Sequence, residues 1–321
     1  MSCASPGEAS VAVSADSASV LATGATGLVG RSIVRRLLAA GRSVRILSRG
    51  GDFPAHPGVS ICRGDVTCDK DLAAALHGCD AIIHCAAEKH DAQTMESVNV
   101  TATRLLFDMA RDSKVSFFCH LSSVGVIGRT RARIVDEATP CHPMNRYTET
   151  KLAAEDIVKR GLPGGSVVIL RPTNVFGAET LAPWLQDCIR SRVRQFLTGR
   201  ERSHLIYVED VAATAVHWLQ ASGRQPVDTF IVSSDEESAN SWGEVQAALA
   251  SMIETAPGPS TLSAPLWMPY LARRIRHGDS NAGDVVYSSN RLRQAGFRIP
   301  YGLRRGLADA VSLWRRRLAA P

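Results

Sequence analysis

Short apolar runs alternate with amphipathic stretches over the first half of the chain. The runs are apolar enough to be buried on both faces and lie at 19–22, 43–47, 59–62, 81–84, 117–121 and 167–170. Between them, apolar residues recur at helical spacing at 29–40, 70–76, 99–113 and 148–160. Buried strands separated by helical crossovers predict an α/β fold with a doubly wound parallel sheet.

The pattern loosens after residue 171. Prolines become frequent there, at positions 172, 183, 226, 257, 259, 265, 269 and 300. We expect residues 172–321 to form mainly a smaller substrate-binding lobe, with segments near 204–217 and 229–233 returning to the large sheet. Residues 1–17 are rich in Ala and Ser and are expected to be a disordered tail.

Composition narrows the class of protein. The chain has 321 residues, 45% of them hydrophobic, and a net charge of +6, which suits a large α/β domain with a smaller lobe. Its eight cysteines form no C-x-x-C pair, so neither a metal site nor a disulfide framework is expected. No apolar run is long enough to span a bilayer and no signal peptide is evident, so we expect a cytoplasmic protein. Basic and aromatic residues are not interleaved as nucleic-acid binding requires.

A glycine-rich turn follows the first predicted strand. Gly24, Gly27 and Gly30 are spaced G-x-x-G-x-x-G and lead directly into a helix that includes Leu28 and Val29. Glycines let the backbone turn tightly and approach a pyrophosphate, while free N–H groups at the helix N-terminus, and the Thr26 segment beside them, face the anion. We therefore assign residues 18–171 to an NAD(P)-binding domain of Rossmann type.

The end of the second strand bears on the choice of cofactor. A carboxylate at this place would bind the adenosine ribose and repel a 2′-phosphate, but this chain has Ser48 and Arg49. A hydroxyl and a guanidinium suit a phosphate, which favours NADP. Asp52 lies close enough to serve the ribose instead, so NAD stays open.

Three side chains form a candidate catalytic group. Ser122 and Ser123 follow the fifth strand, and Tyr147 lies four residues before Lys151 in the next predicted helix. That spacing puts the phenol and the ammonium on one helical face, where the ammonium would lower the phenol pKa. Tyr147 would then move the proton of a secondary alcohol, and Ser123 would bind the reacting oxygen.

Taken together, these motifs resemble those of the extended short-chain dehydrogenase/reductase superfamily, and in particular its NAD-dependent epimerase/dehydratase group. The resemblance extends from about residue 19 to 314. Besides the glycine turn, Ser122-Ser123, Tyr147 and Lys151, the motifs that follow in the family's order begin at Gly64, His84, Asn99, Arg171 and Tyr207.

The resemblance implies further site residues. Asp65 and Val66 would flank the adenine, while Ala86 and Ala87 would lie along the pyrophosphate and ribose. Further cofactor contacts or supports would come from Lys89, Asn99, Pro172 and Val175, and Asn174 would hold the phosphates of a sugar nucleotide. A homodimer through the helices at 101–113 and 148–160 is also implied.

The substrate is less well determined. The resemblance favours a nucleotide-sugar 4-epimerase or 4-ketoreductase, whose substrate diphosphate is usually clamped by two arginines. Those two places hold Ser203 and Asn281 here, although Arg202 and Arg276 lie close by and could substitute. Val124-Gly125 after Ser123 replaces the acidic pair of the 4,6-dehydratases.

Two alternatives stay open. The first is a reductase or dehydrogenase of an apolar substrate, similar to 3β-hydroxysteroid dehydrogenases and dihydroflavonol reductases, with the apolar run 266–271 lining the cleft or touching a membrane surface. The second is a non-catalytic dinucleotide sensor. Loss of Tyr147, Lys151 or Ser123 would favour the sensor, but all three are present.

Overall fold

The computed structural model describes residues 19–50, 53–181, 196–253, 263–277 and 284–319. The expected tail at 1–17, together with Asp52 and Asn281, lies outside the described residues. None of the helices in the described ranges is long and apolar enough to cross a membrane.

A seven-stranded parallel sheet forms the centre of the fold, which confirms the predicted fold class. Its strand order is β10-β7-β5-β4-β1-β2-β3. The strands are β1 (Ser19–Thr23), β2 (Val44–Ser48), β3 (Val59–Arg63), β4 (Cys79–His84), β5 (Phe117–Leu121), β7 (Ser166–Pro172) and β10 (Val227–Val232). The order reverses between β4 and β1, and sheets of this kind bind ligands at the carboxyl ends of the strands beside such a reversal.

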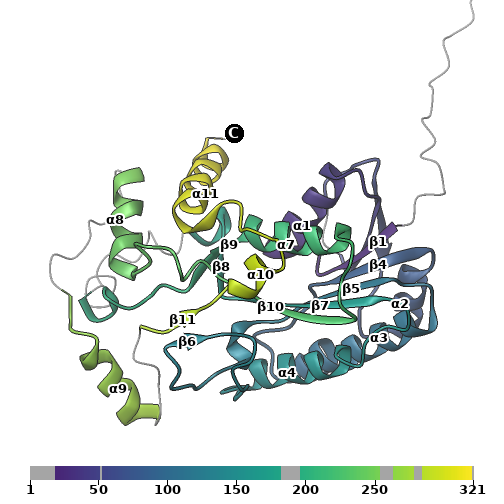
Figure 1. Cartoon of the computed structure of the whole chain (residues 1–321). Helices are drawn as coiled ribbons and strands as arrows, with labels where there is room; N and C mark the ends of the chain where they lie inside the picture. The colour runs from purple at the N-terminus through teal and green to yellow at the C-terminus, as the bar shows by residue number, and fades with distance from the viewer. Residues whose placement is uncertain (1–18, 51–52, 182–195, 254–262, 278–283, 320–321) are drawn as a thin grey trace, which may run out of the picture.

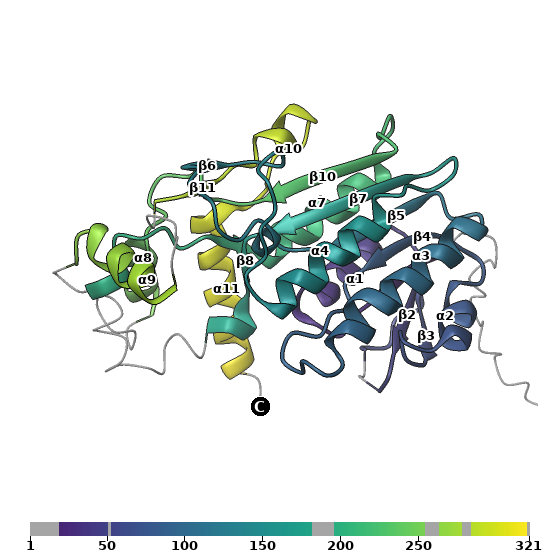
Figure 2. The ribbon, with the colours of Figure 1, turned by 90° about the horizontal axis from the view of Figure 1, so that it is seen from below.

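Helices cover both faces of this sheet (Figures 1 and 2). Alternate residues of β1 show the two layers: Val20 packs in the core of one face and Leu21 in the core of the other. The first face is covered by α1 (Leu28–Ala39) and α7 (Val208–Gln220), and the second by α2 (Asp69–Leu76), α3 (Ala102–Asp112) and α4 (Arg146–Val158). A π-helical segment, η1 (Ser97–Thr101), precedes α3, where an ordinary helix from residue 99 was predicted.

A smaller lobe lies beyond the carboxyl ends of the strands (Figure 2). It contains two short parallel pairs, β6 (Ile134–Val135) with β11 (Val286–Tyr287) and β8 (Asn174–Phe176) with β9 (Leu205–Tyr207). Its helices are α8 (Trp242–Met252), α9 (Trp267–His277) and α11 (Gly302–Leu318). The short helix α10 (Asn290–Gln294) packs instead on β10, and its Leu292 belongs to the core of the large sheet. Tyr207, Leu249 and Leu307 belong to one core that joins β9, α8 and α11.

The later segments meet the large sheet in different ways. Residues 229–233 overlap β10, which forms the edge of the sheet beside β7. Residues 205–207 do not join that sheet, contrary to expectation, because β9 pairs with β8 in a separate two-stranded sheet. The helix α7 that follows β9 instead packs its apolar side on α1 and on β5, β7 and β10 of the large sheet.

Candidate active site

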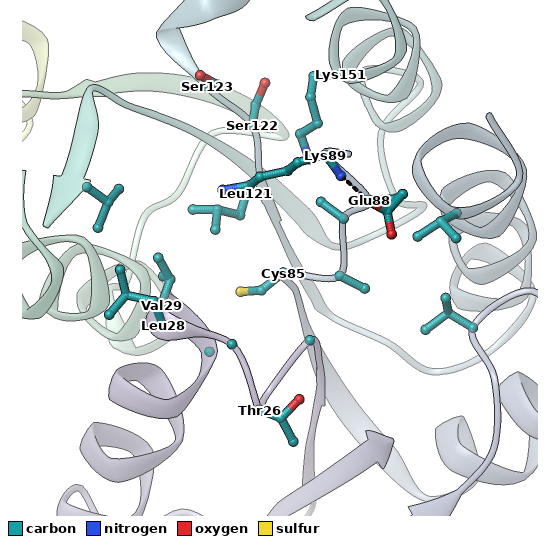
Figure 3. Close-up of a pocket in the computed structure, with 18 of the residues that line it drawn as sticks. Thr26, Leu28, Val29, Cys85, Glu88, Lys89, Leu121, Ser122, Ser123 and Lys151 are labelled. Carbon is teal, nitrogen blue, oxygen red and sulfur yellow. Dashed lines mark hydrogen bonds between the residues drawn. The ribbon is translucent and has the colours of Figure 1, made fainter. Parts of the chain in front are cut away.

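A pocket of about 730 Å³ lies along the carboxyl ends of the strands of the large sheet. Every residue predicted to bind the cofactor or to act in catalysis lines this pocket, with the exception of Asn99. Figure 3 shows Thr26, Leu28 and Val29 of the glycine turn on one side and Ser122, Ser123 and Lys151 on the other. The structure therefore brings Thr26 and Lys151, which are 125 residues apart in the sequence, to the same pocket.

At two positions of the glycine turn, a side chain would collide with neighbouring backbone atoms. Gly24 has a φ of +66°, and a Cβ there would lie 2.6 Å from the backbone nitrogen of Ala86. A Cβ on Gly30 would lie 2.2 Å from the carbonyl oxygen of Gly24. Both glycines are thus required by geometry, and they bring the start of α1 close to the segment after β4.

The end of β2 presents a cation at the mouth of the pocket. The Arg49 side chain is 77% exposed, and its Nε lies 3.9 Å from Oδ2 of Asp65. Asp65 accepts hydrogen bonds from the backbone N–H and the hydroxyl of Thr67, at 2.8 and 2.7 Å, and the Thr67 backbone bond lowers the pKa of its carboxyl group. The exposed guanidinium is only loosely held by this ion pair, so it is available to a ligand.

The position of Tyr147 and Lys151 follows from the start of α4. The Asn145 side chain accepts the backbone N–H of Thr148 at 2.9 Å, and the Thr148 hydroxyl accepts the backbone N–H of Asn145, forming a capping box. The helix therefore begins at Arg146. Tyr147 and Lys151 follow on one face, and both line the pocket.

Burial controls the charge of both groups. Lys151 is 2% exposed, and burial lowers the pKa of its ammonium to about 8. Burial raises the pKa of the Tyr147 phenol above its ordinary value of 10.0. The prediction that Lys151 lowers the phenol pKa is therefore wrong for the chain alone, because loss of solvent outweighs any attraction to the ammonium. At neutral pH the phenol keeps its proton.

The two serines after β5 have different surroundings. The Ser122 hydroxyl donates at 2.6 Å to the buried carboxylate of Glu155, which also forms a buried ion pair with Arg171 at 2.6 Å. The Ser123 hydroxyl oxygen accepts the backbone N–H of Gly125 at 3.1 Å, which leaves its proton for another acceptor. Ser122 therefore ties β5 to α4, and Ser123 offers a donor to the pocket.

Asn99 lies behind the wall of the pocket. Its amide oxygen accepts the backbone N–H of Glu88 at 2.8 Å, and its amide nitrogen donates to the Glu88 carbonyl and to the Thr150 hydroxyl, both at 2.9 Å. The Glu88 carboxylate in turn accepts the backbone N–H of Lys89 at 2.8 Å (Figure 3). Asn99 thus fixes the segment that carries Ala86, Ala87 and Lys89 to the helix of Lys151.

Several pocket residues were not predicted. Cys85 and Glu88 flank predicted positions, and Thr173 lies between Pro172 and Asn174, so their place in the sequence was the available signal. The Thr173 hydroxyl is buried and forms no hydrogen bond with any described residue. A buried hydroxyl without a partner in the pocket wall is suited to a polar group of a ligand.

Of the residues predicted to bind substrate, Ser123 and Asn174 line the same pocket, whereas Arg202 does not. Asn174 is exposed in the pocket. Arg202 donates to the carbonyl oxygen of Asp235 at 2.6 Å and lines a separate pocket of about 230 Å³. The side chain of Arg276, on α9, lies outside the described part of the chain. Ser203 is 1% exposed, and its hydroxyl is within 2.5 Å of the Asn240 amide oxygen.

Comparison with known proteins identifies the class. A profile of the NAD dependent epimerase/dehydratase family matches residues 20–232. The chain is 28% identical to sterol demethylase protein B of Methylococcus capsulatus, over 92% of this chain and 98% of that protein. It is 31% identical to a 3 beta-hydroxysteroid dehydrogenase/Delta 5-->4-isomerase of Mycobacterium tuberculosis, over 68% of this chain and 65% of that protein.

Solved structures agree on the fold. The structure of MoeE5 in complex with UDP-glucose and NAD superposes with a TM-score of 0.71 at 25% identity, covering 94% of this chain and all of the other.

The fold and the pocket thus define an extended short-chain dehydrogenase/reductase with an NAD(P)-binding site. The chain belongs to the NAD dependent epimerase/dehydratase family and is an enzyme of that family. The close glycine turn, the pocket at the sheet reversal and the unpartnered Thr173 hydroxyl all fit a bound dinucleotide. No group of acidic, His or Cys side chains in the described ranges could hold a metal ion.

Proposed function

We propose that the chain is an NAD(P)-dependent reductase or dehydrogenase that acts on a secondary alcohol or ketone of an apolar, sterol-like substrate. The proposal rests on Ser203, an uncharged and buried residue at a place where nucleotide-sugar enzymes of this family usually have an arginine. An arginine there suits the diphosphate of the substrate. Ser203 is uncharged, buried and engaged with Asn240, and the neighbouring Arg202 donates to Asp235.

The charges of the pocket support the same choice. Its described cationic side chains are Arg49, Lys89 and Lys151. None of them belongs to the segment from Pro172 to Val175, which leads into the lobe. An uncharged substrate does not need a cationic side chain in this segment. The sterol and hydroxysteroid enzymes among the relatives are consistent with such a substrate.

The dinucleotide, when bound, supplies or accepts a hydride. The glycine turn would hold its pyrophosphate, and Lys151 and Thr173 would contact its nicotinamide end. Because burial raises the pKa of Tyr147, the phenol is protonated at neutral pH and is ready to donate a proton to a ketone oxygen. The Ser123 hydroxyl would donate a hydrogen bond to the same oxygen, which stabilises the negative charge developing there.

The preference for NADP rests on Arg49. Its guanidinium is exposed beside the pocket, and its ion pair with Asp65 is 3.9 Å long. A 2′-phosphate would give this cation a stronger partner than the carboxylate.

A nucleotide sugar is the second candidate. MoeE5, the solved structure described above, holds UDP-glucose together with NAD, and Asn174 of this chain is exposed in the pocket where it could meet a phosphate. This candidate requires a diphosphate site without the usual arginine at position 203.

Two measurements on the wild-type chain separate the candidates. The first follows oxidation of NADPH and NADH with a 3-ketosteroid or with a UDP-4-keto sugar. The second compares the melting temperature in the presence of sterol and of UDP-glucose, since a ligand that binds the folded state raises it. We expect turnover with the 3-ketosteroid but not with the keto sugar, and stabilisation by the sterol but not by UDP-glucose. Stabilisation by UDP-glucose without any effect of sterols would refute the proposed substrate class.

A further inference from the structure

The small lobe exposes an unusual concentration of large apolar side chains. Ten such side chains are exposed in the described part of the chain, and six of them lie in two neighbouring segments. These six, which we call the lobe patch, are Phe196, Leu197, Trp267, Met268, Leu271 and Ile275. The two segments meet where the backbone N–H of Ala264 donates to the carbonyl oxygen of Phe196 at 2.7 Å.

Most of the lobe patch belongs to α9, whose apolar side faces outward. With 3.6 residues per turn, Trp267, Met268, Leu271 and Ile275 fall within about 100° of arc. Ile275 is 79% exposed and Trp267 is 61% exposed, whereas Pro269 on the opposite side of the helix is buried. A surface helix normally turns its apolar side to the core, whereas α9 turns its apolar side to solvent.

The charged side chains in the sequence of α9 all have one sign. No Asp or Glu occurs between Glu254 and Asp279, while Arg273, Arg274, Arg276 and His277 all lie in α9. The side chain of Arg274 is exposed, and its position on the helix adjoins that of Trp267. Apolar side chains with basic neighbours and no acidic ones are typical of helices that lie in the surface of an anionic membrane.

We propose that the lobe patch binds the surface of an anionic phospholipid bilayer, with α9 lying in the interface. Figures 1 and 2 both place α9 at the end of the molecule remote from α2 and β3. A symmetric dimer through the patch would bring the arginines of two copies together, which like charges oppose. The proposal does not depend on the substrate, since lipid binding needs neither cofactor nor turnover.

The test is co-sedimentation of the full chain with lipid vesicles. Vesicles of phosphatidylglycerol and phosphatidylcholine are compared with vesicles of phosphatidylcholine alone, at low and at high salt. The double variant Leu271→Glu and Ile275→Glu removes two apolar contacts and adds negative charge. Leu318→Glu is the matched control, because Leu318 is 68% exposed on α11 outside the lobe patch. Thermal unfolding and NADPH binding of each variant show that the fold is kept.

We expect the wild type and Leu318→Glu to sediment with the anionic vesicles, less so at high salt, and the double variant to bind at least about tenfold more weakly. Three results would overturn the proposal: no binding of the wild type, equal binding to both kinds of vesicle, or undiminished binding of the folded double variant. A wild-type dimer that the double variant abolishes, without lipid binding, would assign the patch to self-association instead.

Discussion

Replacing Lys151 by Met should stabilise the protein while abolishing its activity. Lys151 is 2% exposed, and its pKa falls from 10.5 to about 8 because its ammonium is buried. A change of one in pKa corresponds to about 1.4 kcal/mol, so the buried cation costs the folded state about 3 kcal/mol at neutral pH. Met has a similar length and no charge, and it avoids this cost.

The lowered pKa of Lys151 predicts how the stability of the protein changes with pH. Between the folded pKa of about 8 and the unfolded value of 10.5, the unfolded chain binds more protons than the folded chain, so stability rises with pH. The cost of the ammonium is therefore complete below about pH 8 and disappears above 10.5. The advantage of Lys151→Met should be greatest at neutral pH and should shrink as the pH approaches 10.5.

Thermal unfolding at several pH values tests this reasoning. For a chain of 321 residues, about 3 kcal/mol corresponds to roughly 4 °C in Tm. The control is Lys89→Met, because Lys89 lies in the same pocket but is exposed, and its replacement should leave Tm nearly unchanged. A Lys151→Met variant that is less stable than the wild type, or whose advantage does not vary with pH, would refute the assignment of a buried, costly ammonium.

Three further variants test other parts of the site. Tyr147→Phe should lower kcat by about 10²- to 10⁴-fold in a reductase assay and leave NADPH binding intact, because only the proton donor is lost; unchanged kcat would argue against that role. Gly24→Ala should destabilise the chain in thermal unfolding by about 2 kcal/mol more than Gly41→Ala, since both glycines have a positive φ but only Gly24 would place a Cβ 2.6 Å from the backbone of Ala86. Arg49→Ala should raise the KM for NADPH about tenfold and hardly affect that for NADH, and equal changes would contradict binding of a 2′-phosphate.

The pattern of the sequence was sufficient to predict the large sheet. Each apolar run between 19 and 170 became a strand, and the run 117–121 has the same bounds as β5. Such runs are informative because a strand covered by helices on both faces must be apolar throughout. The run at 59–62 is the exception, because it became the edge strand β3, where Ser60 and Ile61 are exposed. The glycine turn was predictable for a similar reason, since close approach of two backbone segments excludes side chains.

Other features depend on contacts that a pattern does not record. The pairing of β9 with β8 instead of the large sheet is set by packing in the lobe. Spacing placed Tyr147 and Lys151 on one face, but the direction of the phenol pKa depends on burial, which only the folded chain reveals. Arg202 is adjacent to the expected diphosphate position in sequence, yet it faces Asp235 in a different pocket.

The proposed reduction of a ketone by NADPH and Tyr147 is tested most directly by following the transferred hydride. Wild-type protein and Tyr147→Phe are incubated with a 3-ketosteroid and with NADPH that carries deuterium at the transferable position, and the alcohol formed is examined by mass spectrometry. The proposed hydride transfer yields one deuterium on the carbinol carbon with the wild type and little product with the variant. Wild-type protein that binds NADPH but forms no labelled alcohol from either a ketosteroid or a keto sugar, or a variant that forms it at the full rate, would contradict it.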